Sequence, residues 1–133
     1  MDLIDPLFDA VIKGDDSVVN HVLSLGISLT VNDEDGLTVL HWAASSTEGE
    51  KLVPFLIANG AMIDAKDNFG RTPLHIHCAR GRIYAVACLV YHGADTNCQT
   101  LDTGLTPLQV ASSHGHDEIQ RILLAYGATP PNG

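Results

Sequence analysis

The stretch GRTPLHIHCARG, residues 70–81, occurs in related form at two other places in the chain. GLTVLHWAAS begins at Gly36 and GLTPLQVASSHG begins at Gly104, so consecutive copies are 34 residues apart. A more divergent copy, DPLFDAVIKGDDSVVNHVLSLG, ends at Gly26 and lacks the opening of the other three. Self-similarity at a fixed period of this length is typical of proteins built from stacked structural repeats.

Each copy predicts a pair of helices. Thr72 is suited to cap the first helix with its side-chain oxygen, and Pro73 suits the first helical position, where its missing N–H is not needed. His75 follows three residues after the cap and is placed to bond back to it. The second helix has apolar residues at helical spacing and ends at a glycine such as Gly93, where a left-handed backbone is favoured. Pro54, inside the second copy's outer helix, predicts a late start or a bend there.

The segments between helix pairs contain DG or NFG and predict β-hairpins. Hairpin, helix, turn and helix, repeated with Thr-Pro-Leu-His at the first helix, resemble the ankyrin repeat family. The resemblance covers residues 3–130 and implies an all-α repeat solenoid, with helix-turn-helix units joined by β-hairpin loops. It implies a single domain, residues 1–133, with four repeats at about 3–35, 36–69, 70–103 and 104–130, of which the terminal copies are degenerate.

Composition and charge limit the cellular compartment and the classes of binding partner that we expect. The 133 residues are 45% hydrophobic, enough for the core of one domain. The net charge is −9, and residues 1–66 hold eleven acidic and three basic residues, a net −8, which disfavours nucleic acids and anionic membrane surfaces. No apolar run approaches the roughly 18 residues of a membrane span, and the N-terminus is acidic rather than basic like a secretory signal. The chain has three cysteines, a small and odd number that does not suit a disulfide framework. We therefore expect an intracellular protein, cytoplasmic or nuclear, with free thiols.

His75, His77 and Cys78 raise the question of a metal or catalytic site. Zinc needs four converging ligands, usually in Cys-x₂₋₄-Cys or His-x₃₋₅-His pairs, and the sequence has no such pair here. Packing explains these residues better: His75 starts a helix, Cys78 lies between helices, and Cys88 lies on the apolar face of the outer helix. Motifs such as Gly-x-Ser-x-Gly and His-Glu-x-x-His are missing. We expect no catalytic residue, metal or cofactor; the alternative is a metal-dependent or hydrolytic enzyme that uses the cluster His75, His77 and Cys78.

Two side chains differ from those usual in the family. His77 replaces an alanine, and we expect either a satisfied interior histidine or one that crowds the helix pair. Trp42 replaces a leucine, and we expect it to be buried in the stack rather than to serve as a stacking platform.

The resemblance implies that the chain holds another protein along a concave surface formed by inner helices and loop tips. Such a surface is rigid before binding, so little ordering remains to be done when a partner docks. The implied contact positions are Glu34, Asp35, Leu37, Ser45 and Ser46 in the second repeat, Lys66, Asn68, Phe69, Arg71, Ala79 and Arg80 in the third, and Asp102, Thr103, Leu105, Ser113 and His114 in the fourth. We expect the chain to be monomeric on its own.

Three of these positions are apolar although the fold does not require it: Leu37, Phe69 and Leu105. Exposed apolar residues on loops are suited to anchor a partner, and truncating such an anchor costs at least about 2 kcal/mol of binding energy. The alternative is that they are ordinary scattered surface residues.

Charge is also unevenly placed along this surface. The first loop carries Asp33, Glu34 and Asp35, whereas the third repeat carries Arg71, Arg80 and Arg82. A partner of opposite polarity would therefore dock in one orientation. The alternative is that these charges pair with each other between adjacent loops.

Asn97 is a candidate for modification. The stretch LVYHGADTN, with Leu89 eight residues and Asp95 two residues before Asn97, resembles the ankyrin-repeat sites that asparaginyl hydroxylase modifies. Thr96 departs from the aliphatic residue usual there. The alternative, which we favour, is a turn asparagine that bonds its own backbone.

Overall fold

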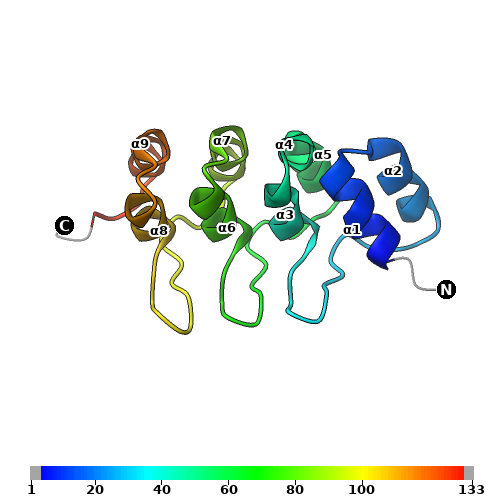
Figure 1. The fold of residues 1–133 in the computed structure, drawn as a ribbon, viewed down its shortest axis with the longest axis horizontal. Coiled ribbons are helices and arrows are strands. Elements are labelled where there is room, and N and C mark those ends of the chain that lie inside the picture. Colours follow the sequence, from blue (N-terminus) through cyan, green and yellow to red (C-terminus); the bar gives the residue numbers. More distant parts are fainter. Residues whose placement is uncertain (1–3, 131–133) are drawn as a thin grey trace.

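A computed structural model describes residues 4–130, which form four helical layers in a row, with the loops between layers projecting to one side (Figure 1). Each layer has an inner helix followed by an outer one. The layers comprise α1 (Ile4–Lys13) and α2 (Asp16–Ser24); α3 (Val39–Trp42), the 3₁₀ turn η1 (Ala43–Ser45), α4 (Thr47–Lys51) and α5 (Val53–Ala58); α6 (Pro73–Arg80) and α7 (Ile83–Tyr91); α8 (Pro107–Ser113) and α9 (Asp117–Ala125). The predicted repeat solenoid is confirmed.

The inner helix α6 begins with the predicted cap. Thr72 Oγ1 accepts a hydrogen bond from the His75 backbone N–H at 3.4 Å, and the Thr72 backbone N–H donates to His75 Nδ1 at 3.1 Å. In α8 the Thr106 backbone N–H donates to Gln109 Oε1 at 2.9 Å, so glutamine takes the part of the histidine. These reciprocal bonds satisfy N–H groups that a helix start leaves without partners.

The capping histidines also join neighbouring layers. Because Nδ1 of each ring accepts a bond from a backbone N–H, the ring proton is on Nε2. His41 Nε2 donates to the carbonyl oxygen of Arg71 at 2.8 Å, and His75 Nε2 donates to that of Leu105, also at 2.8 Å. The same residue that starts one helix therefore holds the base of the next loop.

The loops reverse direction without forming the predicted β-hairpins. Each closes at its base with a backbone bond, from Asp33 N to Leu37 O at 2.9 Å and from Asp67 N to Arg71 O at 3.0 Å. The side chain of the first loop residue accepts further backbone N–H groups. Asp67 Oδ1, for example, accepts hydrogen bonds from the backbone N–H of Phe69 and of Arg71. Because these side chains occupy the donors, no residue between 4 and 130 is in a β-strand. The predicted turns form, but the prediction of paired strands was wrong.

Neighbouring loops are joined near their tips. The Asn68 backbone N–H donates to Asp35 O at 2.9 Å, and the Asn68 side chain donates to Glu34 O at 3.0 Å. One layer further on, the Leu101 backbone N–H donates to Phe69 O at 2.9 Å. The three loops therefore form a connected row rather than independent fingers.

Pro54 interrupts the outer helix of the second layer, as predicted. α4 ends at Lys51, and α5 begins at Val53 with Pro54 in its first turn, where no N–H is required. The helix is therefore divided in two at Leu52.

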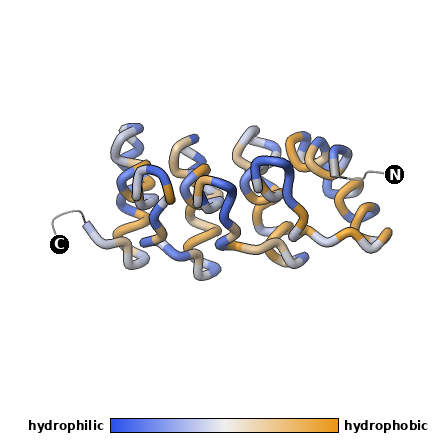
Figure 2. Tube along the Cα trace, turned by 90° about the horizontal axis from the view of Figure 1, so that it is seen from below, coloured by the Kyte–Doolittle hydropathy of each residue, from blue (hydrophilic) through white to orange (hydrophobic). Residues whose placement is uncertain are grey.

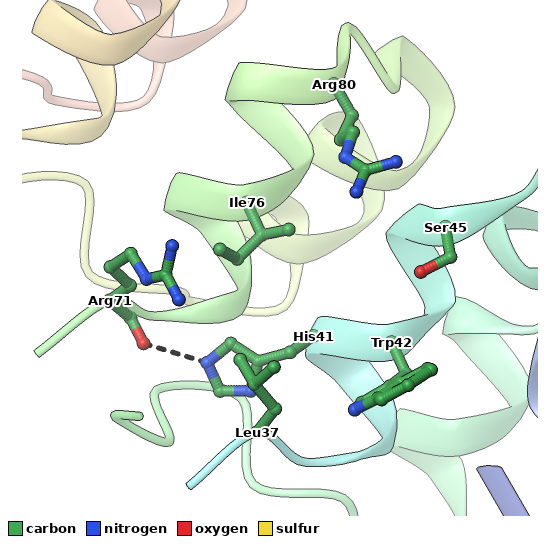
Figure 3. Close-up of a pocket in the computed structure, with 7 residues that line it drawn as sticks. All are labelled: Leu37, His41, Trp42, Ser45, Arg71, Ile76 and Arg80. Carbon is green, nitrogen blue, oxygen red and sulfur yellow. Dashed lines mark hydrogen bonds between the residues drawn. The ribbon is translucent and has the colours of Figure 1, made fainter. Parts of the chain in front are cut away.

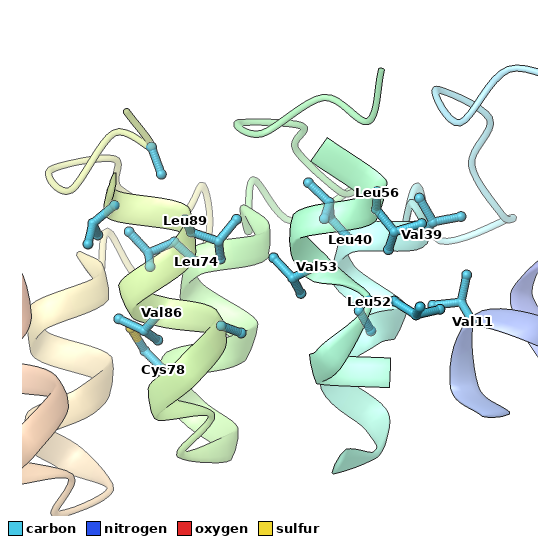
Figure 4. Packing of buried hydrophobic residues seen from close by; sticks show 14 of the residues in the cluster. Val11, Val39, Leu40, Leu52, Val53, Leu56, Leu74, Cys78, Val86 and Leu89 are labelled. Carbon is cyan, nitrogen blue, oxygen red and sulfur yellow. The ribbon is translucent and has the colours of Figure 1, made fainter. Parts of the chain in front are cut away.

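A continuous apolar core runs through the layers (Figure 4). Hydrophobic residues recur in the helices of every layer, whereas the loops are mostly hydrophilic (Figure 2). Equivalent leucines that are buried in successive layers are Leu40, Leu74 and Leu108 on inner helices and Leu56, Leu89 and Leu123 on outer helices. Each contributes about 1.5–3 kcal/mol by burial.

Cys78 is buried as predicted, while Cys88 is only half-buried. Within residues 4–130, no helix combines the length and apolar character needed to cross a membrane.

Candidate functional site

A groove of about 380 Å³ lies between α3 and α6 on the inner side of the array (Figure 3). Its lining residues are Leu37, His41, Trp42, Ser45, Arg71, Ile76 and Arg80. Four predicted contact positions meet here: Leu37, Ser45, Arg71 and Arg80. Trp42 and Ile76 were not among the predicted contacts.

Two residues at the same position of successive repeats form the middle of the groove. Trp42 and Ile76 are 34 residues apart, and the same interval leads back to Phe8 and on to Val110. Phe8 and Val110 are buried, whereas Trp42 and Ile76 are half-buried and line the groove. The repeat spacing alone could have identified this row, because Trp42 follows the capping His41 as Ile76 follows His75.

Trp42 is held in place by its neighbours. Its ring stacks on Phe8 with centroids 5.4 Å apart, and its indole N–H donates to Asp33 Oδ2 at 2.9 Å. The prediction that Trp42 is buried in the stack was therefore only half correct. Its ring packs against Phe8 of the first layer, and the part left uncovered lines the groove between the second and third layers.

Two arginines flank Ile76. Arg71 Nε lies 2.6 Å from Asp67 Oδ2, and the Arg71 guanidinium carbon lies 5.4 Å from the centre of the Phe69 ring. Within residues 4–130, Arg80 forms neither an ion pair nor a hydrogen bond through its exposed side chain. The alternative of pairing between adjacent loops was wrong for Arg71, because the acid it binds belongs to its own loop.

The apolar row predicted at Leu37, Phe69 and Leu105 is not a row of exposed anchors. Phe69 is 50% exposed, but Leu37 and Leu105 are half-buried at the loop bases. Leu101, which we did not single out, is 79% exposed. Leu101 follows Thr100 at the loop base as Asn68 follows Asp67, and its backbone N–H donates to Phe69 O. An apolar residue at the position of Asn68 was the signal in the sequence.

The remaining predicted contacts are divided between loops and helix ends. Exposed loop positions are Glu34, Asp35, Lys66, Asn68, Asp102 and Thr103. His114 is exposed at the end of α8, where its ring stacks with that of His116 at 6.1 Å between centroids. Ser46, Ala79 and Ser113 lie near the inner-helix ends, outside the lining of the groove. The fourth-layer positions Asp102, Thr103, Leu105 and His114 do not join this groove either.

His75, His77 and Cys78 are used by the fold. His75 caps α6, as described above, and burial lowers its pKa. His77 is fully buried between α3 and α6; its Nε2 donates to Leu40 O at 2.9 Å, while Nδ1 has no partner, and burial lowers the ring's pKa to about 4. Burial also raises the pKa of the Cys78 thiol. No group of three or more His, Cys, Asp or Glu in residues 4–130 is placed to hold a metal ion.

Asn97 bridges the last two layers. Its side-chain N–H donates to Gly127 O at 3.1 Å, and its side-chain oxygen accepts from the Thr129 backbone N–H at 2.9 Å. The interpretation that its side chain bonds its own backbone was therefore wrong, since the partners belong to the next layer. Its hydroxylation stays a prediction.

Comparisons with known proteins agree with this architecture. A family model described as ankyrin repeats (3 copies) matches residues 7–100 and, overlapping, 40–132. The human SMC5-SMC6 complex localization factor protein 1 is 39% identical over 92 residues, which are 69% of this chain and 9% of that protein. The RelA-associated inhibitor of Mus musculus is 33% identical over 103 residues, 77% of this chain and 12% of that protein. An ankyrin repeat protein of Rickettsia bellii is 33% identical over 118 residues, 88% of this chain and 65% of that protein. The chain thus spans less than two thirds of each of these relatives.

Proposed function

The chain belongs to the ankyrin-repeat family, and from this premise we propose that it is a protein-interaction module that holds a segment of another protein along its inner groove and loop tips. Ankyrin repeats bind other proteins, and the partner of this chain is a protein. Two relatives carry names that describe association with other proteins, a complex localization factor and a RelA-associated inhibitor. An adaptor, scaffold or regulatory subunit fits this pattern.

The groove between α3 and α6 is the observation that carries the proposal. Its floor offers the half-exposed side chains of Trp42 and Ile76, which lose contact with water when a partner covers them. Its walls are fixed in advance by the bonds from His41 to the next layer and between loop tips. A surface that is ordered before binding loses little conformational entropy on association.

The loop tips supply a second part of the surface. Phe69 and Leu101 are exposed side chains on adjacent tips joined by a backbone bond. A partner that buries both removes a connected apolar surface from water, which is how a few residues come to dominate binding energy. The other exposed loop residues, Glu34, Asp35, Lys66, Asn68, Asp102 and Thr103, are suited to a polar rim.

The proposed role is binding, without catalysis. His75 and His77 are engaged in capping and packing, and the buried Cys78 thiol has a raised pKa, which disfavours the reactive thiolate. We also propose a reducing, intracellular compartment, cytoplasmic or nuclear, supported by the three unpaired cysteines, all within residues 4–130. A monomer in isolation is part of the same proposal.

The test compares two serine substitutions. Tagged wild type, Ile76→Ser in the groove and Tyr84→Ser on the exposed side of α7 are used to capture proteins from cell extract, with quantification by mass spectrometry. We expect a partner that is retained by Tyr84→Ser and reduced at least about tenfold by Ile76→Ser, because only the second loses apolar contact. Thermal melts establish that both variants are folded. Equal capture of every protein by the two variants would contradict the proposal.

A further inference from the structure

We propose that the segment bound in the groove is an extended peptide with one apolar side chain, which packs over Ile76 and Trp42, and one carboxylate, which binds Arg80. This rests on the proposed interaction function and adds the chemistry of the partner.

The apolar part of the inference follows from the groove floor. Leu37, Trp42 and Ile76 come from the two sides of the groove and face the same space (Figure 3). Trp42 is restrained by Phe8 and Asp33, so it forms a fixed wall rather than a mobile lid. The polar Ser45 hydroxyl lines the same groove and is suited to bond a peptide backbone. The groove, of about 380 Å³, has room for an aliphatic or aromatic side chain.

The acidic part follows from Arg80. Its guanidinium stands at the end of α6 away from the loops, above Ile76, and is exposed (Figure 3). The other cations are differently placed: Lys13, Arg71 and Arg121 pair with acidic side chains, and Arg82 Nε donates to Ala44 O. Lys51 lies on α4, and Lys66 is exposed on the loop before α6, away from the lining of the groove. Arg80 is therefore a charge-bearing donor beside an apolar floor, in a protein whose net charge is −9. Arginine binds carboxylates through two parallel N–H groups, which gives direction as well as attraction.

Charge also sets the orientation of the peptide. Arg71, at the loop end of the groove, already binds Asp67, so its positive charge is partly compensated. Glu34 and Asp35 are exposed on the neighbouring loop and repel a carboxylate there. The peptide's acidic residue is therefore directed to the Arg80 end, and its apolar residue lies between that acid and the loops.

Trp42 provides the readout, since it is the only tryptophan of the chain and lines the groove. The probes are blocked ten-residue peptides of Gly and Ser that carry one Leu or Phe and one Glu, separated by one to four residues in either order. Matched peptides replace the Glu by Gln or Lys, or the apolar residue by Ser. Binding is followed by Trp42 emission up to millimolar peptide.

We expect at least one Glu peptide to bind, with at least tenfold weaker binding of its Gln, Lys and Ser counterparts. Arg80→Glu should reverse the preference so that the Lys peptide binds better. Arg121→Glu, a matched change on exposed α9, should leave the preference as in the wild type.

Three results would overturn the inference: no peptide binds, Lys peptides are preferred by the wild type, or Arg80→Glu changes nothing. These outcomes are distinct from failure of the proposed function. If Ile76→Ser still loses captured proteins while peptides show no charge preference, the interaction function stands and only the partner chemistry is wrong. If neither capture nor peptide binding depends on the groove, both proposals fall.

Discussion

The buried His77 makes the stability of the array depend on pH. Burial between α3 and α6 lowers the pKa of its ring from 6.5 to about 4 in the folded protein. The unfolded chain takes up a proton near pH 6.5, while the folded chain resists it until about pH 4. Stability from this group is therefore complete above pH 6.5 and is lost as the pH falls from 6.5 toward 4.

The magnitude follows from the two pKa values. Each pKa unit is worth about 1.4 kcal/mol, so the full shift corresponds to about 3 kcal/mol of unfolding free energy. Between pH 7 and pH 5, where the folded ring stays mostly neutral, we expect a loss of about 2 kcal/mol from His77 alone. Burial also lowers the pKa values of His41 and His75, so they add losses of the same sign.

Urea unfolding at pH 7, 6 and 5, followed by circular dichroism, measures the effect. His77→Ala should be less sensitive to acid than the wild type by about 2 kcal/mol over this range, because it lacks the buried ring. The variant keeps His41 and His75, so their contribution cancels in the comparison. His114→Ala, which removes an exposed histidine, should follow the wild type. Parallel pH dependence of wild type and His77→Ala would refute the reasoning.

Three further substitutions test the fold and the surface. Gly36→Ala should lower the unfolding free energy more than Gly115→Ala: both glycines have positive φ, but only at Gly36 would a Cβ lie 2.7 Å from Asn68 Oδ1. The expected gap is at least about 1 kcal/mol by urea titration, and equal costs would show that the loops yield freely. Thr72→Ala should cost about 1 kcal/mol through loss of the cap, measured in the same way; no change would show that the cap is not needed. Leu101→Ser should leave thermal stability within about 0.5 kcal/mol of wild type yet weaken capture of a groove-dependent partner at least about tenfold. Unchanged capture would remove this loop tip from the binding surface.

The sequence predicted the layers because their causes are local. Thr72 and His75 cap a helix with neighbours three residues away, and Pro54 breaks a helix wherever that helix packs. The exposure of Trp42 and Leu101 has a different origin. It depends on the contacts that each residue makes with the neighbouring layer or loop, and a pattern within one repeat does not contain those contacts.

The strands failed to form for a related reason. A hairpin prediction assumes that backbone groups bond to each other across the loop. In this chain Asp33 and Asp67 stand at the loop bases, and their carboxylates accept the N–H groups that a strand ladder would use. The turn sequence therefore predicted the chain reversal but not the strand pairing, because the side chain of the first turn residue competes for the backbone N–H groups.

The segment 70–81 serves both the fold and the groove, and helical geometry keeps the two apart. His77 and Cys78 face inward, whereas Ile76 and Arg80, four residues apart, share the face that lines the groove. His75 ties this helix to the next loop and needs nothing from Ile76 or Arg80 to do so. Substitutions on the groove face are therefore free to change the partner without disturbing the stack, while the inward residues are constrained by both adjacent layers.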